Sequence, residues 1–337
     1  MTAASVLVDT DFHRLADDHE ALRMLAAAQC QGRQRISGIT TVTGNAWAGA
    51  CAAHVREALE QLGLQGLSVR AGASRPILHR QSDFAHRSRL YGAAFGGAWG
   101  NSKLLPARDG DEQSSCSAEE THAVEYIVRT LRRSAGTQSV LALGPLTNLA
   151  LALRIAPDIT AQVQRLVVMG GALFVPGNVT PSAEFNWWFD AEAASIVLEE
   201  DIPLEVVPLD ATDSILFDYD RYRAWESRYK DHPFFHSFHE PKFAKIFEAD
   251  KNFRLPVWDA VAAACLIEPG LIRQCKDLWL TVDCSHGPSY GRAIAFDDPS
   301  YFNLQQPRRR RARVVLEVDQ GAFWELYESL IFENGPA

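Results

Sequence analysis

Four carboxylates lie close together near the start of the chain, at Asp9, Asp11, Asp17 and Asp18. The apolar, β-branched run at residues 5–8 predicts a buried strand, and the residues after Asp18 are typical of the first turns of a helix. The four side chains therefore crowd the carboxyl end of a strand, where open α/β sheets bind their ligands. Neighbouring anions raise one another's pKa, and a divalent cation with oxygen ligands relieves that repulsion. We therefore predict a metal site, because helix capping explains only Asp17 or Asp18.

Polar groups also follow later predicted strands. Asn45 follows one of them, the turn that begins at Leu143 follows another, and Glu184 and Asn186 lie in the segment after a third. Because the carboxyl ends of parallel strands share one edge of a sheet, these groups can converge on one pocket. Glu184 and Asn186 lie among apolar and aromatic residues, where a buried polar group needs a partner. We expect a polyhydroxylated ligand to supply such partners.

Strand and helix patterns alternate along the chain, which predicts an α/β fold: an open, mainly parallel sheet with helices on both faces. No internal repeat or low-complexity linker interrupts the pattern, so we predict a single domain over residues 1–337. The predicted strands are residues 5–8, 36–42, 67–72, 140–143, 166–169, 204–209, 278–282 and 313–318. The predicted helices follow Asp18 and cover residues 46–62, 117–134, 149–155, 191–199, 260–267 and 321–332.

Two segments depart from this alternation and are predicted to act as lids over the site. Residues 78–110 are rich in Gly, His, Arg and aromatic residues and show no clean period, as in a binding loop or a disordered insertion. Residues 218–252 are aromatic and charged and are expected to form helices that pack over the site.

The composition limits the kinds of partner. A formal net charge of −9 argues against a general nucleic-acid binder. No stretch is long and apolar enough to span a bilayer, and the first residues do not look like a signal peptide. The six cysteines are scattered without a CxxC pair, which favours free, buried thiols in a reducing cytosol. We therefore expect a cytoplasmic protein with no membrane partner.

The order and spacing of several motifs resemble the inosine–uridine preferring nucleoside hydrolase family over nearly the whole chain. The motifs are Asp9-Thr10-Asp11 with Asp17-Asp18, Thr43-Gly44-Asn45, Gly144-Pro145-Leu146-Thr147-Asn148, Met169-Gly170-Gly171, Gly177-Asn178 with Ala183-Glu184-Phe185-Asn186, and Trp258-Asp259. The resemblance implies a Ca²⁺-dependent N-ribohydrolase with a Rossmann-like nucleoside hydrolase fold, a small nucleoside as substrate, and a homodimer or homotetramer.

The resemblance also implies roles for individual residues. Matched position by position, Asp11, Asp18, Asp259 and the backbone carbonyl of Leu143 would hold calcium, and Asp9 would support this metal site. The ribose hydroxyls would be bound by Asp17, Asn45, Asn178, Glu184 and Asn186, and Phe185 would line the sugar pocket. Asp11 would also be the general base that takes a proton from the attacking water. Carboxylates near the sugar suit this chemistry, because the transition state is a ribosyl cation.

The chain departs from the family at the positions that assist departure of the nucleobase. Trp258 occupies a position where many members carry a histidine, and Tyr91 aligns loosely with a histidine of the lid. The loop between Asp11 and Asp17 is also longer than in the best-known members. An indole stacked on a purine could favour the protonated base through a cation–π contact. We therefore expect purine ribonucleosides to be favoured, with Trp258 and Tyr91 as candidate catalytic residues.

Two alternatives remain open from the sequence. The Asp9-Thr10-Asp11 motif also begins haloacid-dehalogenase-type phosphatases, in which Asp9 would be the nucleophile and Asp11 the acid and base. The missing leaving-group histidine also allows a non-catalytic protein that binds a nucleoside or sugar.

Overall fold

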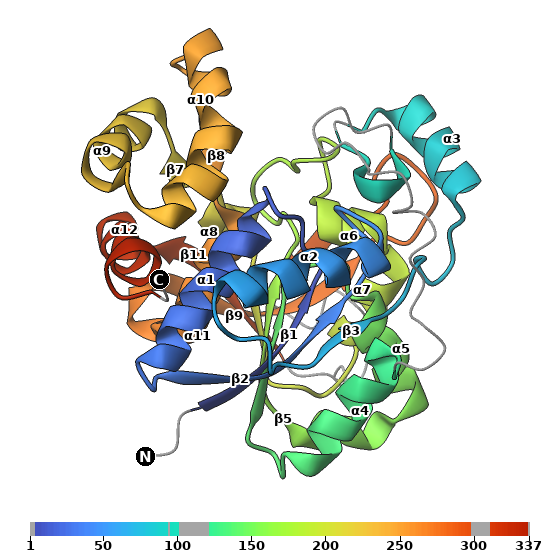
Figure 1. Ribbon diagram of the computed structural model, residues 1–337. Helices are drawn as coiled ribbons and strands as arrows, with labels where there is room; N and C mark the ends of the chain where they lie inside the picture. The colour runs from blue at the N-terminus through green and yellow to red at the C-terminus, as the bar shows by residue number, and fades with distance from the viewer. Residues whose placement is uncertain (1–3, 94, 101–120, 298–310, 336–337) are drawn as a thin grey trace.

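A nine-stranded sheet forms the centre of the structure, with the strand order β10-β9-β11-β6-β5-β4-β1-β2-β3 (Figure 1). The structure is a computed structural model and describes residues 4–93, 95–100, 121–297 and 311–335. All neighbouring strands from β3 to β11 are parallel, whereas β9 pairs antiparallel with both β11 and β10. The predicted mainly parallel α/β sheet is confirmed, with an antiparallel edge added.

The strands of the large sheet are β1 (Ala4–Thr10), β2 (Gln34–Thr41), β3 (Val69–Ala71), β4 (Gln138–Ala142), β5 (Val163–Met169), β6 (Leu204–Val207), β9 (Ile272–Val282), β10 (Ala293–Phe296) and β11 (Ala312–Val318). A small ribbon pairs β7 (Leu216–Phe217) with β8 (Leu255–Pro256). The α-helices are α1 (Asp17–Cys30), α2 (Ala48–Gln61), α3 (Gln81–Tyr91), α4 (Ala123–Arg133), α5 (Thr147–Ile155), α6 (Phe185–Phe189), α7 (Ala191–Leu198), α8 (Leu209–Thr212), α9 (Tyr219–Tyr229), α10 (Glu240–Ala249), α11 (Trp258–Ile267) and α12 (Gln320–Glu328).

Alternate residues of the central strands enter two different hydrophobic cores. In β1, Val6 and Val8 pack into the core that contains α1, α2, α11 and α12, whereas Leu7 packs into the core formed with α4, α5 and α7. Successive strand side chains point to opposite faces, so a strand buried on both faces reads as a continuous apolar run. Helices on both faces therefore explain why the central strands lack an apolar–polar alternation.

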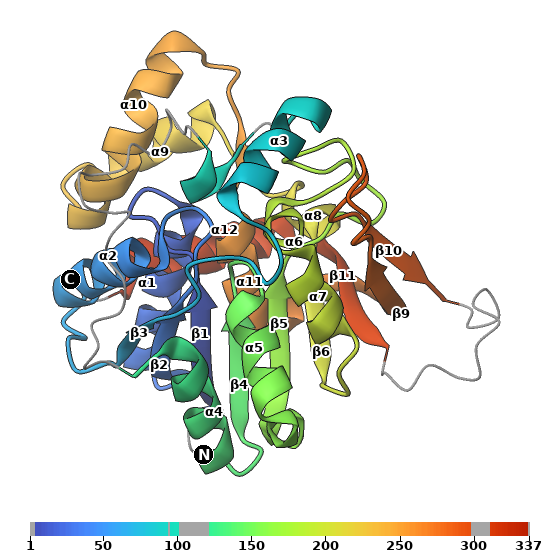
Figure 2. The same cartoon turned by 90° about the vertical axis from the view of Figure 1, so that its right-hand side faces the viewer.

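The strand order reverses beside β1, which lies between β4 and β2. Ligands of open α/β sheets bind outside the carboxyl ends of the strands at such a reversal. Helices α3, α9 and α10 stand at that same end of the molecule (Figure 2). Within the described residues, no helix is long and apolar enough to cross a membrane.

Several predicted boundaries were wrong for local reasons. Residues 81–91 form α3, so the irregular interpretation of the 78–110 segment fails there, and residues 101–110 lie outside the described part of the chain. The backbone N–H of Arg80 donates to the Asp83 carboxylate (3.0 Å), an interaction that begins α3 despite its weak apolar period. The predicted strand 204–209 stops at Val207, because Pro208 has no N–H for the sheet.

Other predictions need smaller corrections. The helix predicted from residue 117 is described only from Ala123. The predicted final helix divides into α12 and a π-helical turn, Ser329–Glu333. The five described cysteines are free, as predicted, but only Cys51 and Cys265 are buried. Cys116 lies outside the described residues.

Candidate functional site

A cavity of about 300 Å³ lies at the carboxyl ends of the central strands. It is bounded by groups from widely separated parts of the chain: Leu15, Ala16, Asp17, Asn45, Phe95, Leu143, Met169, Asn178, Val179, Glu184, Phe185, Asn186, Lys242, Leu255, Trp258 and Asp259. The predicted convergence of polar strand ends on one pocket is therefore observed. Asp11 and Asp18 are each 1 % exposed and lie beside this lining, where they interact electrostatically with Asp259.

Asp11 follows β1 and is held between two glycine-containing turns. The backbone N–H of Asn45 donates to Asp11 Oδ2 (2.6 Å). A Cβ on Gly44 would collide with this carboxylate, and a Cβ on Gly144 would lie 2.8 Å from the Asp11 backbone nitrogen. These two glycines therefore allow the turns after β2 and β4 to approach Asp11 closely, which explains their place in the sequence motifs.

Asp17, Asp18 and Asp259 come together where α1 and α11 begin. Each offers a carboxylate oxygen, and these oxygens lie within 4.8 Å of one another. Asp17 Oδ2 accepts the backbone N–H of Asp259 (2.8 Å), and Asp18 accepts bonds from the Thr10 hydroxyl and from Asn45 Nδ2 (3.4 Å). The residue at the N-cap of α1 is Ala16, with no side-chain cap, so neither aspartate caps its own helix. The capping alternative is therefore wrong for α1 but holds for α11, because Asp17 accepts an N–H in the first turn of that helix.

The ionisation of this cluster is strongly perturbed. Burial, together with the charge of Asp17, raises the pKa of Asp18 from 3.8 to about 7. Burial and the surrounding carboxylates raise the pKa of Asp11 and Asp259 well above the usual range. Burial also raises the pKa of Asp17, against the charge of Lys242. Such a group of anions is unfavourable without a compensating cation, and its donors are all oxygens that suit a hard divalent ion.

Glu184 and Asn186 obtain hydrogen-bond partners from the protein itself. Glu184 Oε2 accepts the N–H of Gly171 (2.9 Å) and of Trp187 (3.1 Å), and Oε1 accepts the N–H of Asn186 (2.7 Å). Asn186 Nδ2 donates to the carbonyl of Leu143 (2.9 Å). These buried groups have the partners that the sequence analysis expected, but the protein supplies them, and both residues also line the cavity. Burial nevertheless raises the pKa of Glu184 to about 7.

Asp9 lies beneath the cavity and does not line it. Its Oδ1 accepts bonds from the Thr40 hydroxyl (2.6 Å) and from Asn148 Nδ2 (2.8 Å), and the side chain is 1 % exposed. Among the described residues, Asp9 Oδ2 is buried without a partner, and burial raises the Asp9 pKa to about 7. Because Asp9 does not line the cavity and its Oδ1 is engaged, its position argues against the role of a phosphatase nucleophile.

Two aromatic side chains and Asn178 complete the wall. Trp258 is half-buried, and its indole N–H donates to Asp213 Oδ1 (2.9 Å), which fixes the plane of the ring at the cavity. The Phe185 ring packs against Phe95 with a centroid distance of 5.1 Å. Asn178 Oδ1 accepts the N–H of Phe185 (3.0 Å), so in the described structure its amide N–H groups are left for a ligand.

The predicted lid segments contribute differently from expectation. The 218–252 segment supplies Lys242 from α10, whereas none of its histidines lines the cavity. His239 is fully buried among aromatic rings, and His236 pairs with Glu240 on the surface. From the 78–110 segment, Phe95 lines the cavity. The Tyr91 side chain lies outside the described part of the structure.

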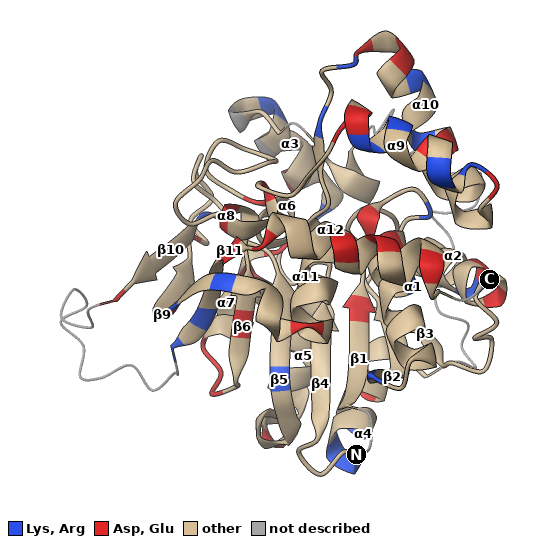
Figure 3. Ribbon diagram, turned by 90° about the vertical axis from the view of Figure 1, so that its left-hand side faces the viewer, with Lys and Arg blue, Asp and Glu red and all other residues tan. Residues whose placement is uncertain are grey.

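Sequence reasoning missed Lys242 and the role of Asn148. Helices α9 and α10 carry mixed acidic and basic residues (Figure 3), so nothing in the sequence distinguishes Lys242 from a surface lysine. Asn148 was part of a recognised motif but had no assigned role. Its Oδ1 accepts the Ala73 N–H (2.8 Å) while its Nδ2 supports Asp9, so it joins β1, β2 and the loop after β3.

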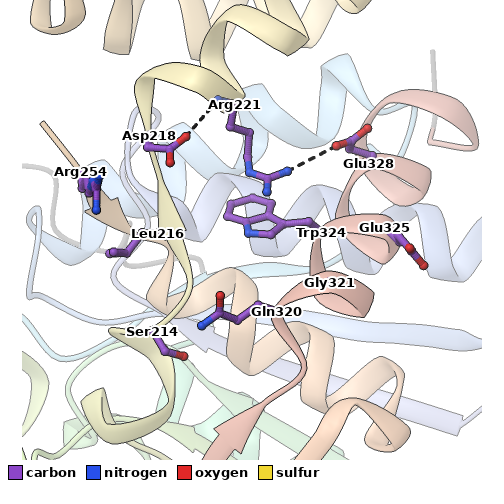
Figure 4. A pocket seen from close by; sticks show the side chains of 10 residues that line it. All are labelled: Ser214, Leu216, Asp218, Arg221, Arg254, Gln320, Gly321, Trp324, Glu325 and Glu328. Atoms are coloured by element: carbon purple, nitrogen blue, oxygen red, sulfur yellow. Dashed lines mark hydrogen bonds and ion pairs between the residues drawn. The ribbon is translucent and has the colours of Figure 1, made fainter. Parts of the chain in front are cut away.

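A second cavity of about 600 Å³ lies beside α9 and α12 (Figure 4), and none of Asp11, Asp17, Asp18 and Asp259 lines it. The Arg221 guanidinium stacks on the Trp324 ring at 4.0 Å and forms an ion pair with Glu328 (3.5 Å). Arg221 is therefore already engaged. We identify the first cavity, at the carboxyl ends of the central strands, as the candidate active site and call it the carboxylate cavity.

Known proteins are similar to this chain in sequence and in fold. Residues 6–325 match the model of the family described as "Inosine-uridine preferring nucleoside hydrolase". The pyrimidine-specific ribonucleoside hydrolase RihB of Shigella flexneri serotype 5b (strain 8401) is 30 % identical over 327 residues, with 93 % of each chain covered.

Two solved structures have the same fold at lower identity. The purine-preferring ribonucleoside hydrolase from Gardnerella vaginalis has a TM-score of 0.75 at 24 % identity, covering 97 % of this chain and 98 % of that one. The inosine-guanosine nucleoside hydrolase has a TM-score of 0.76 at 21 % identity, with the same coverage. From the family match, the curated relative and a carboxylate-lined cavity at the strand ends, it follows that this chain belongs to the inosine–uridine preferring nucleoside hydrolase family and is a hydrolase of N-glycosyl compounds.

Proposed function

We propose that this protein is a Ca²⁺-dependent ribonucleoside N-ribohydrolase that releases a free nucleobase and ribose and favours purine ribonucleosides. The observation that carries the proposal is the meeting of Asp11, Asp17, Asp18 and Asp259 at one cavity that amide side chains also line. Carboxylates and amides are the groups that a polyhydroxylated, cation-like transition state requires.

The residues present fit calcium. Asp11, Asp18 and Asp259 offer carboxylate oxygens and Leu143 a backbone carbonyl oxygen. Burial and the neighbouring carboxylates raise the pKa of the three aspartates, and Asp9 Oδ2 is buried without a partner in the described structure. Asp11, Asp18, Asp259 and the Leu143 carbonyl would hold the ion, with Asp9 in support. When bound, Ca²⁺ supplies charge that makes a coordinated water more acidic.

In the reaction we propose, the protein moves a proton and stabilises a cation. Asp11 takes a proton from the attacking water, whose oxygen bonds to the anomeric carbon of ribose. The glycosidic C–N bond breaks, its electron pair leaves with the base nitrogen, and the leaving base takes up a proton from solvent water. Asp17, Asn45, Asn178, Glu184 and Asn186 hold the ribose hydroxyls, while their negative charge and dipoles stabilise the ribosyl cation.

We further propose that Trp258 serves the leaving base and that Phe185 packs against the sugar. The hydrogen bond from the Trp258 indole N–H to Asp213 Oδ1 (2.9 Å) orients the ring. The π face of the ring attracts a base that is gaining positive charge. Tyr91 and the lid that carries it are proposed to approach the same base. A single domain, a cytoplasmic location and a dimer or tetramer remain predictions, the last measurable by light scattering.

The general test is a panel of ribonucleosides assayed for free ribose, with and without a chelator. We expect inosine, guanosine and adenosine to be cleaved faster than uridine and cytidine. The chelator should abolish cleavage, and added Ca²⁺ should restore it. Tight inosine binding with no ribose release would establish the non-catalytic alternative, and faster cleavage of pyrimidines, as in the name of the curated relative, would reject the purine preference alone.

Trp258→Ala is expected to lower the cleavage rate of inosine by roughly 30-fold more than that of p-nitrophenyl riboside, because a desolvated cation–π contact contributes about 2 kcal/mol. The nitrophenolate leaves without a proton, so it does not need the indole. Steady-state kinetics on both substrates measure the difference.

The matched control is Asp213→Asn, which keeps the Trp258 ring and weakens only the acceptor of its N–H. It should have a much smaller effect. Equal losses on the two substrates in Trp258→Ala would mean that the indole only shapes the cavity.

A further inference from the structure

A cluster outside the carboxylate cavity joins three segments that are distant in sequence. His79 lies in the loop before α3, Glu192 in the first turn of α7, and His286 in the loop between β9 and β10. Their potential ligand atoms all lie within 4.8 Å of one another. None of the three residues lines the candidate active site, and the proposed reaction gives them no role.

His79 and Glu192 lie at an ion-pair distance that also suits two ligands of one metal ion. His79 Nε2 lies 3.6 Å from Glu192 Oε1, beyond normal hydrogen-bond length. Two ligands of a tetrahedral zinc ion, with metal bonds of about 2.0–2.2 Å, lie roughly 3.4 Å apart. Among the described residues, Glu192 Oε1 is buried and accepts no hydrogen bond within 3.5 Å, and the atom it faces is the His79 Nε2 of the ion pair. An ion between the two atoms would satisfy this oxygen.

The other oxygen of Glu192 is already fixed by the protein. The Tyr290 hydroxyl donates to Glu192 Oε2 (2.5 Å) and accepts the N–H of Ala191 (3.3 Å). This contact orients the carboxylate so that Oε1 faces His79, which is 7 % exposed. Partners of this kind, which hold a ligand from behind, are a regular feature of metal sites.

The two histidines are also held in place by their surroundings. The backbone N–H of Ile77 donates to Asp190 Oδ2 (3.0 Å), which ties the His79 loop to the start of α7. The His79 and His286 rings meet edge to face with a centroid distance of 4.8 Å. The backbone N–H of Ser285 donates to Asp283 (2.7 Å), which restrains the loop that carries His286.

We propose that His79, Glu192 and His286 form a zinc site, separate from the carboxylate cavity, that fastens the base of α3 to α7 and the β9–β10 loop. Two imidazole nitrogens and one carboxylate, with water as the fourth ligand, are a known zinc ligand set, whereas calcium prefers oxygen ligands only. The ion would stabilise the fold, because α3 begins only two residues after His79.

Isothermal titration tests the site on the purified full chain. The protein is stripped of metal, saturated with Ca²⁺ so that oxygen sites are filled, and titrated with ZnCl₂. We expect one zinc per chain and a higher melting temperature with zinc than without. His286→Gln should weaken zinc binding by at least about 10-fold, since even the loss of a supporting partner weakens metal sites by 10–100-fold. Nucleoside cleavage with Ca²⁺ should be unchanged in this variant.

The control is His236→Gln, an exposed histidine that pairs with Glu240 at a spacing able to bind zinc weakly. It should bind zinc like the wild type. Because His286 is exposed, its replacement should not prevent folding, and Glu192→Gln provides a second variant that keeps the acceptor for Tyr290. The proposal is overturned by no zinc uptake, by uptake unchanged in His286→Gln, or by uptake lost in Asp18→Asn instead.

Discussion

Replacing Asp18 by asparagine is expected to weaken calcium binding by at least about 100-fold and to lower the cleavage rate by several orders of magnitude. The change removes one anionic ligand but keeps the size of the side chain. Asp18 is 1 % exposed and lies with Asp17 and Asp259 in the group of close carboxylates, so no exposed group can replace it. Elemental analysis and ribose release measure the two effects on the same samples.

Stability gives an independent check on this prediction. Because the folded-state pKa of Asp18 is raised from 3.8 to about 7, metal-free protein should lose stability as the pH rises from about 4 to 7. Added Ca²⁺ should recover this stability near pH 8 in the wild type and much less in Asp18→Asn. Melting curves with and without Ca²⁺ measure the difference.

The matched control is Asp190→Asn, since Asp190 is also buried, with a pKa raised to about 6, but does not line the cavity. That variant should keep stoichiometric calcium. If Asp18→Asn retains both calcium and normal turnover, the metal site has been placed wrongly.

Ribonucleosides should be cleaved with a kcat/KM about 10⁴-fold or more above that of the matching 2′-deoxyribonucleosides. A site built to bind a hydroxyl discriminates against its absence, because the polar groups that bind the hydroxyl are then left unpaired. Here the cavity wall carries Asp17, Asn45, Asn178, Glu184 and Asn186, and the Asn178 amide N–H groups have no partner within the described residues. Adenosine and 2′-deoxyadenosine share the same base, so their comparison isolates the sugar.

A variant can then assign part of this discrimination to one residue. Asn178→Ala should lower activity on adenosine more than on 2′-deoxyadenosine if its amide binds the 2′-hydroxyl, since Oδ1 is already used by the Phe185 N–H. Phe95→Leu is the matched control, because it changes the same wall without removing a polar group. Similar cleavage of the two nucleosides by the wild type would exclude a ribose-specific site.

The sequence by itself determined the parallel part of the sheet and the position of the acidic cluster, but not the antiparallel edge at β10. Continuous apolar runs such as residues 5–8 can only be buried on both faces, which requires helices on each side of a parallel sheet. Asp9 and Asp11 directly follow such a run, so their place at its carboxyl end is fixed by chain connectivity. The glycines of the motifs are local signals of the same kind, since Gly44 and Gly144 mark the turns that approach Asp11.

Only the tertiary structure decided which partners these side chains use. The N–H of Asp259 donates to Asp17 across 242 positions of sequence, and Glu184 is satisfied by nearby backbone N–H groups that the sequence could not orient. Lys242 and the His79, Glu192 and His286 cluster show no spacing pattern at all. Their neighbours are set by how helices and loops pack, and packing depends on the combined shape of many side chains. Local sequence patterns report periodicity and turns, so they place elements and strand ends but not contacts between distant segments.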